Sequence, residues 1–120
     1  MISPYVLRAI GPRQAMRYFQ SAERISAERA LAIGLVHEVA PLDQLDAAVA
    51  ALVKPLLAGG PLAQKAAKEL INAVHGRPLD EATLEDTAQR IARQRRTAEA
   101  RDGVSAFLDK RPPAWITPKP

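Results

Sequence analysis

Residues 24–39 read RISAERALAIGLVHEV and contain a complete local unit: a helix cap, two turns of helix, a glycine stop and a short strand. Ser26 is a favoured N-cap residue, and Gly34 can take the left-handed conformation that ends a helix. Residues 35–39 then read as a strand, which Pro41 closes. A single strand leaves a row of backbone donors and acceptors unpaired. The stretch therefore predicts either that this strand pairs with a second molecule or that its partner lies in sequence outside these 120 residues.

Helical patterns extend on both sides of this stretch. Asp43, Asp80 and Thr97 stand before apolar repeats at spacings of three and four, where N-cap side chains are expected. Gly11 should stop a first short helix, and Pro12 should start the next one. We therefore predict a mainly α chain with about seven helical segments and one short strand. The expected helices are 5–10, 12–19, 27–33, 44–58, 62–75, about 81–96 and 98–110.

Composition favours helices packed into one modest core. The 120 residues are 48% apolar but only 4% aromatic, so alanine and aliphatic side chains must do most of the packing. Cysteine is absent, which excludes disulfides, thiolate metal sites and thiol catalysis. No apolar run approaches the roughly 20 residues of a membrane span, and Arg8, Gly11 and Pro12 interrupt the first apolar stretch. We expect a soluble protein of the cytoplasm with no membrane partner.

The charge is moderately basic, with 17 Lys and Arg residues against 13 Asp and Glu residues, a net charge of +4. Its strongest feature is the run RIARQRRTAEAR at residues 90–101. This run fits a solvated helix face, and it also fits contact with phosphate on a nucleotide-containing ligand or a nucleic acid. No aromatic residues interleave with the arginines, which weakens a single-strand stacking surface. A small basic module for nucleic-acid binding or self-association therefore stays open as an alternative.

Side chains arranged for catalysis or metal binding are missing from the sequence pattern. His37 and His75 have no ligand-like neighbour at helical spacing, and no nucleophile elbow surrounds any serine. The glycine pair at 59–60 follows a helix rather than a strand, unlike a phosphate-binding loop. The acidic residues at 81–86 suit the positive end of a helix dipole. We predict no catalytic residue, no metal site and no cofactor in this chain.

A more specific stretch is DGVSAFLDKRPPAW at residues 102–115. Phe107 and Lys110 are three residues apart, which places them on one face if the helix continues to Lys110. An aromatic ring beside an ammonium group could pack against a purine and neutralise a phosphate. Trp115 is expected to anchor the tail by packing.

Three segments in this order resemble a known family. They are AERISAERALAIGLVHEVAP at 22–41, GGPLAQKAAKELIN at 59–72 and the stretch at 102–115. Together they look like the C-terminal part of the crotonase family, the enoyl-CoA hydratases and isomerases. The opening ISPYVLRAIGPRQAMRYF is similar to the segment after that family's glycine-rich turn. Its S-P-Y-V motif at residues 3–6 resembles the methylglutaconyl-CoA hydratase-like subgroup.

The resemblance implies the C-terminal helical part of the α/β crotonase (ClpP-like spiral) fold. In that family the strand after the glycine pairs with sheet elements of the preceding spiral core. The family's two catalytic glutamates and its oxyanion-hole amides lie upstream of the position that matches Ile2, so none is expected here. The implied division is 1–40 for linker helices and strand, 41–111 for the helical domain, and 112–120 for an extended tail.

The resemblance also implies a role. The intact enzyme would hydrate an α,β-unsaturated acyl-CoA, with the coenzyme A thioester as substrate and no further cofactor, while this chain alone would be inactive. Family members form trimers or hexamers, and their last helix covers the nucleotide end of coenzyme A. By position, Phe107 matches the adenine-side aromatic and Lys110 the phosphate-side lysine. A nucleic-acid partner is not implied.

Overall fold

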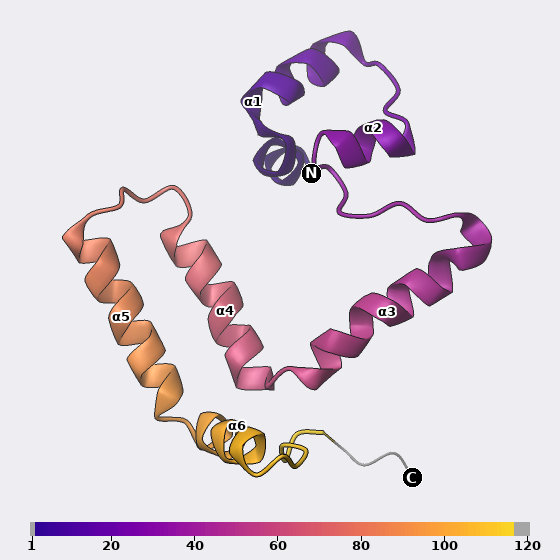
Figure 1. The fold of residues 1–120 in the computed structure, drawn as a ribbon. Helices are drawn as coiled ribbons and strands as arrows, with labels where there is room; N and C mark the ends of the chain where they lie inside the picture. Colours follow the sequence, from indigo (N-terminus) through magenta and orange to yellow (C-terminus); the bar gives the residue numbers. More distant parts are fainter. Residues whose placement is uncertain (1, 117–120) are drawn as a thin grey trace. The chain divides into compact units, whose positions relative to one another are not determined.

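The protein is mainly α-helical, as the sequence predicts. The computed structural model describes residues 2–116, and these contain no strand (Figure 1). They divide between two compact units, Met1–Ala48 and Val49–Pro120, which are described separately below. The predicted domain division at residue 40 refers to an intact enzyme of the family and stays a prediction. The elements are α1 (Ser3–Ser21), α2 (Ala27–Ala32), the 3-10 turn η1 (Leu42–Gln44), α3 (Leu45–Ala58), α4 (Pro61–Val74), α5 (Glu81–Arg95) and α6 (Ala98–Leu108).

The prediction of a strand at 35–39 is wrong for the described chain. The backbone N–H of Leu35 donates to the carbonyl of Ala30 at 2.8 Å, and that of Gly34 donates to Leu31 at 3.1 Å. With Gly34 at a φ of 76°, this is the closed helix end known as a Schellman motif. The first amide of the expected strand is thus used to close α2. Within residues 2–116 no other strand is present with which the rest of the segment could pair, and a strand without a partner gains no stabilisation from inter-strand hydrogen bonds.

A break in α1 separates the two N-terminal helices that the sequence predicts. Gly11 has φ 73° and ψ 165°, which is non-helical backbone inside the span of α1. Glycine reaches a positive φ without a Cβ clash, and a residue before proline is disfavoured in the helical region. The sequence Gly11-Pro12 therefore sets the break.

The core of the first unit lies between α1 and α2. Ile10, Ala15 and Tyr18 of α1 are buried, as is Ala30 of α2. The Nε–H of Arg29 donates to the Tyr18 hydroxyl at 2.7 Å, so the one polar atom of the buried ring has a partner.

The end of α1 carries an ionic network around a strained residue. Ala22 has a φ of 53°, which is left-handed backbone that costs an L-residue energy. Arg17 donates twice to the Glu23 carboxylate, at 2.9 and 2.7 Å, and the Ser21 hydroxyl donates to it at 2.9 Å. The hydrogen bond from Arg17 is the main cause that lowers the pKa of Glu23 to about 2.

The start of α3 differs from the prediction. Asp43 was expected to cap the helix, but it lies inside the turn η1, and α3 begins only at Leu45. Pro41 precedes the turn and offers no side-chain acceptor, so the helix begins through a tight 3-10 turn instead. Pro55 lies within α3, which continues to Ala58.

The second unit is built on an antiparallel pair of helices. Figure 1 shows α4 and α5 side by side, and α6 packs on α5. Asp80 caps α5, because its carboxylate accepts from the Thr83 amide at 2.9 Å, as the sequence predicts. That hydrogen bond is the main reason why the pKa of Asp80 is lowered.

The apolar faces of the second unit are largely uncovered. Ala106 is buried at 1% exposure, but Leu52, Ile71 and Leu84 are exposed at 60%, 65% and 57%. Much of the apolar face that the amphipathic patterns predict therefore has no surface packed against it in the described chain. Within residues 2–116 no single helix is long and apolar enough to cross a membrane. The segments Leu42–Ala58 and Pro61–Val74 would reach that length only as a pair, bent by 103°.

Candidate functional site

The predicted aromatic, Phe107, lies in the last turn of α6. Thr97 caps this helix, since its hydroxyl accepts from the Ala100 amide at 3.1 Å. The Phe107 side chain is 83% exposed, and it lines an apolar hollow of about 410 Å³ together with Trp115 and Leu108. An open, apolar wall of this kind is suited to a flat ring such as a purine.

The predicted lysine lies beyond the helix, which corrects the expectation that Phe107 and Lys110 share one helical face. The helix ends at Leu108, and Lys110 has a φ of 54°. The N–H of Arg111 donates to the Ala106 carbonyl at 3.0 Å, and that of Lys110 donates to Phe107 at 3.4 Å. This is again a Schellman motif, with a lysine at the position that glycine usually takes.

The tail after Lys110 folds back onto the unit. The Trp115 indole N–H donates to the Ala58 carbonyl at 3.1 Å, which confirms Trp115 as an anchor. The Trp115 ring lies so close to Gly103 that a Cβ there would be 2.9 Å from it. Residues 113–116 form a turn, closed by a 3.0 Å bond from the Ile116 N–H to the Pro113 carbonyl, so this part of the tail is not extended as expected. Residues 117–120 lie outside the described residues.

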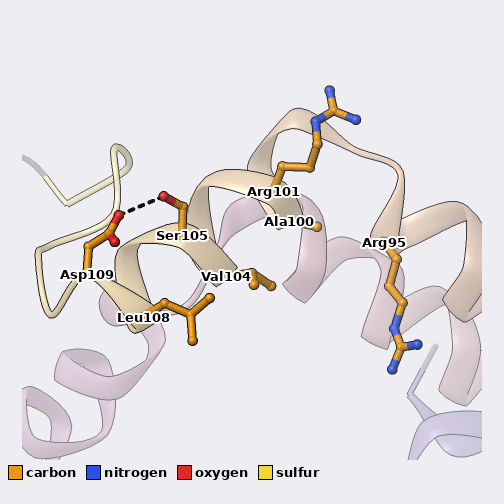
Figure 2. A pocket seen from close by; sticks show the side chains of 7 residues that line it. All are labelled: Arg95, Ala100, Arg101, Val104, Ser105, Leu108 and Asp109. Carbon is orange, nitrogen blue, oxygen red and sulfur yellow. Dashed lines mark hydrogen bonds between the residues drawn. The ribbon is translucent and has the colours of Figure 1, made fainter.

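A second hollow, of about 650 Å³, lies along α6 (Figure 2). Figure 2 shows Val104 and Leu108 on one side of the helix, whereas the Arg101 guanidinium points the other way. Arg101 donates to the Arg96 carbonyl at 2.7 Å. The lining is thus an apolar strip with charged groups at its rim. The residues that line it are Arg95, Ala100, Arg101, Val104, Ser105, Leu108 and Asp109.

The carboxylate of Asp102 joins α6 to the tail. It accepts from the Ala114 amide at 2.7 Å and from the Arg111 guanidinium at 2.8 Å. The amide of Ala114 is the main cause that lowers the pKa of Asp102, and Arg111 adds to it. Asp102 is therefore a charged acceptor at neutral pH.

Glu99 provides the helix cap that α4 lacks locally. Gly60 precedes α4 and has no side chain to accept from its first amides. The Glu99 carboxylate of α6 accepts from the amides of Leu62 and Ala63, each at 2.9 Å. A carboxylate at this position also suits the positive end of the helix dipole. The start of α4 is thereby tied to the helix that carries Phe107.

One arginine of the basic run is paired with a carboxylate. Arg90 donates to the Asp86 carboxylate at 3.1 Å, and Arg77 donates to it at 2.8 Å. These bonds lower the pKa of Asp86, with Arg90 as the main cause. The charge of Arg90, the first arginine of the run, is therefore balanced within the chain.

Sequence reasoning missed both Asp102 and Glu99 as organising residues. The two contacts of Glu99 join residues 36 and 37 positions apart, and Asp102 reaches an amide 12 positions away. Neither spacing matches a local capping rule. Glu99 reads instead as an acidic residue in a first helical turn. Among the described residues, no three His, Cys, Asp or Glu side chains are grouped so that they could hold a metal ion.

Comparison with known proteins assigns the chain to a class. A family model described as enoyl-CoA hydratase/isomerase matches residues 1–118. The chain is similar to a solved enoyl-CoA hydratase from Shewanella pealeana, with 40% identity and a TM-score of 0.89 over 95% of this chain. It is 32% identical to 2,3-dehydroadipyl-CoA hydratase of Escherichia coli over 90% of its length. It is 29% identical to crotonyl-CoA hydratase of Syntrophomonas wolfei over 92% of the present chain.

The chain belongs to the enoyl-CoA hydratase/isomerase family. Its structural neighbours are enoyl-CoA hydratases with the crotonase fold, as the resemblance implied. The chain spans less than half of these relatives, namely 42% of the Shewanella structure and 42% of each of the two curated hydratases. The C-terminal placement that the resemblance implied is not established by these matches.

Proposed function

We propose that the chain is a helical segment of an enoyl-CoA hydratase/isomerase-family enzyme that covers the nucleotide end of coenzyme A. The observation that carries the proposal is the family match over residues 1–118, combined with the exposed Phe107 and Lys110 at the end of α6. Phe107 would contact the adenine ring. The Lys110 ammonium would bind a phosphate through a charge-assisted hydrogen bond.

The same segment would contribute contacts between subunits of a trimer or hexamer. Support comes from the apolar side chains that α6 leaves open, with Val104 at 62% and Leu108 at 71% exposure. Large apolar surfaces of this kind are stabilised when another protein surface covers them. Subunit contacts would supply such a surface.

The intact enzyme would add water across an α,β-unsaturated acyl-CoA in the cytoplasm, without a further cofactor. Two relatives are named as hydratases of CoA thioesters, which supports hydration as its reaction. In such a reaction, carboxylates move the protons and backbone amides hold the thioester oxygen. Because we expect these groups outside this chain, we expect the chain alone to show no hydration of crotonyl-CoA above the uncatalysed rate.

Calorimetric titration of the 120-residue chain with 3′-phospho-ADP, the nucleotide part of coenzyme A, tests the binding role. We expect saturable binding that Lys110→Ala weakens about tenfold, as expected for loss of one charge-assisted contact, and that Phe107→Ala also weakens. Pantetheine, which lacks the nucleotide, should not compete. Absence of nucleotide binding, or equal binding by the Lys110→Ala protein, would overturn the proposal.

A further inference from the structure

The carboxylate of Asp102 closes a loop of chain around Lys110. Asp102 lies on α6, before Lys110, and both of its partners lie after it. The Ala114 amide donates to one carboxylate oxygen at 2.7 Å, and the Arg111 guanidinium donates to the other at 2.8 Å. A single side chain on α6 therefore links the helix to the chain that follows Lys110.

The guanidinium of Arg111 connects this contact to a wider network. It also donates to the Ser105 hydroxyl at 3.1 Å. The Ser105 hydroxyl donates in turn to the Asp109 carboxylate at 2.9 Å, as Figure 2 shows. Arg111 is 3.8 Å from that same carboxylate. The planar guanidinium is thus fixed among oxygens of three side chains, which suits its rigid fork of donors.

This network lies next to a backbone conformation that lysine disfavours. Lys110 has a φ of 54°, and the Arg111 N–H reaches the Ala106 carbonyl only because the chain reverses there. A lysine at a position suited to glycine requires surrounding contacts to hold it. Besides the two backbone hydrogen bonds of the turn, the contacts from Asp102 to Arg111 and Ala114 hold the chain directly after Lys110.

We infer that Asp102 is a positioning residue for the phosphate-binding lysine, acting through Arg111 and Ala114 to hold Lys110 where its ammonium meets the nucleotide. This inference rests on the proposed function. Asp102 itself would not touch the ligand. Its contribution is to reduce the number of directions that the Lys110 side chain samples before binding, which lowers the entropy lost when the nucleotide binds.

A double-mutant cycle tests this role. We expect Asp102→Asn to weaken the binding of 3′-phospho-ADP about fivefold in the parent chain, and to have no further effect in a Lys110→Ala chain. A residue that acts through Lys110 must show this non-additivity, whereas a purely structural residue would weaken both chains equally. Asp102→Glu keeps the charge and both acceptors and should bind within about twofold of the parent. The control Asp46→Asn, at the start of α3, should change nothing.

The outcomes separate the inference from the function on which it rests. If Lys110→Ala binds as the parent does, the proposed function fails. Two results would refute the positioning role and leave the proposed function standing. In the first, Lys110→Ala weakens binding but Asp102→Asn does not. In the second, Asp102→Asn weakens binding equally in the parent chain and in the Lys110→Ala chain. Amide NMR spectra should show that the changes in Asp102→Asn are confined to residues 102–116. If α6 itself unfolds in that variant, the Asp102→Glu protein decides, and its loss of binding would overturn the inference.

Discussion

Replacing Lys110 with glycine should make the chain more stable and weaken its nucleotide binding at the same time. The φ of 54° at Lys110 costs an L-residue about 1–2 kcal/mol, because the Cβ approaches the next carbonyl oxygen. Glycine avoids this cost but loses about 0.5–1 kcal/mol more conformational entropy on folding. The difference predicts a net gain of about 0.5–1 kcal/mol in the free energy of unfolding.

The same substitution removes the ammonium group. A hydrogen bond to a charged group contributes about 1.5–3 kcal/mol, and about 1.4 kcal/mol corresponds to a tenfold change in dissociation constant. The dissociation constant for 3′-phospho-ADP should therefore rise about tenfold or more. Stability and binding are expected to move in opposite directions.

Thermal unfolding followed by circular dichroism, together with calorimetric titration, measures both effects. A gain of about 1 kcal/mol raises Tm by about 4–8 °C in a domain of 60–100 residues, so Lys110→Gly, with a gain of about 0.5–1 kcal/mol, should raise Tm by about 2–8 °C. The matched variant Lys110→Ala loses the ammonium but keeps the strained backbone, so it should show the binding loss without the gain in Tm. Ala22→Gly relieves the left-handed backbone of the first unit and should leave nucleotide binding unchanged.

Equal changes of Tm in the two Lys110 variants would refute the strain argument, since only glycine relieves the backbone. A Lys110→Gly protein less stable than the parent would also refute it. Unchanged binding in both variants would show that the ammonium does not meet the phosphate.

Three further predictions concern single contacts. Glu99→Ala should lower the free energy of unfolding in urea by about 1–2 kcal/mol, because two amides of α4 lose their acceptor; an unchanged value would contradict the cap. Alanine in a helix is normally more stabilising than glycine by roughly 1 kcal/mol. Gly103→Ala should not raise the free energy of unfolding by this amount, since its methyl group would lie 2.9 Å from the Trp115 ring. The fluorescence of Trp115 should shift to longer wavelength, and an unshifted, stabilised protein would argue against that contact. The pKa of Glu23 is lowered to about 2 from 4.5 by Arg17, so its stabilising effect is present above pH 4.5 and is lost as the pH falls through about 2. An NMR titration with a midpoint near 4.5 would disagree with the pairing.

Local rules of the sequence predict most of the helices. Ser26, Asp80 and Thr97 each accept a hydrogen bond from an amide three residues on, at 3.1, 2.9 and 3.1 Å. These caps were predictable because the acceptor and donor lie within one turn of each other. Asp43 does not cap α3 as the same rule predicts, since the chain enters α3 through a 3-10 turn that contains Asp43.

Such rules could not predict that residues 35–39 form no strand in the described chain. Its residues have the right composition, but a strand forms only where a second chain segment supplies hydrogen-bond partners. In the described chain the amide of Leu35 bonds to Ala30 and closes α2. The composition of residues 35–39 indicates a preference for strand conformation. Whether the strand forms depends on a neighbouring strand, which the local sequence does not specify.

The candidate site is predicted only in part by spacing. The sequence marks Phe107, but the three-residue interval to Lys110 assumes a helix that in fact ends at Leu108. No glycine marks that end, and the stop signal that the sequence carries, Pro112 and Pro113, predicts an end near Lys110 instead. The residues that hold the tail, Asp102 and Arg111, act across the helix end. Their roles follow from the fold rather than from helical periodicity.

The end of α1 shows how far backbone strain supports a role for Lys110. Ala22 is also left-handed, at a φ of 53°, and an arginine, a carboxylate and a serine hydroxyl surround that turn as well. Ala22 carries no group that could bind a ligand, so strain held by an ionic network is not in itself a sign of function. Lys110 differs from Ala22 because its side chain ends in a cation, to which the proposed function assigns a phosphate. The network of Asp102 is therefore best understood as the means by which a lysine, rather than a glycine, can occupy this turn.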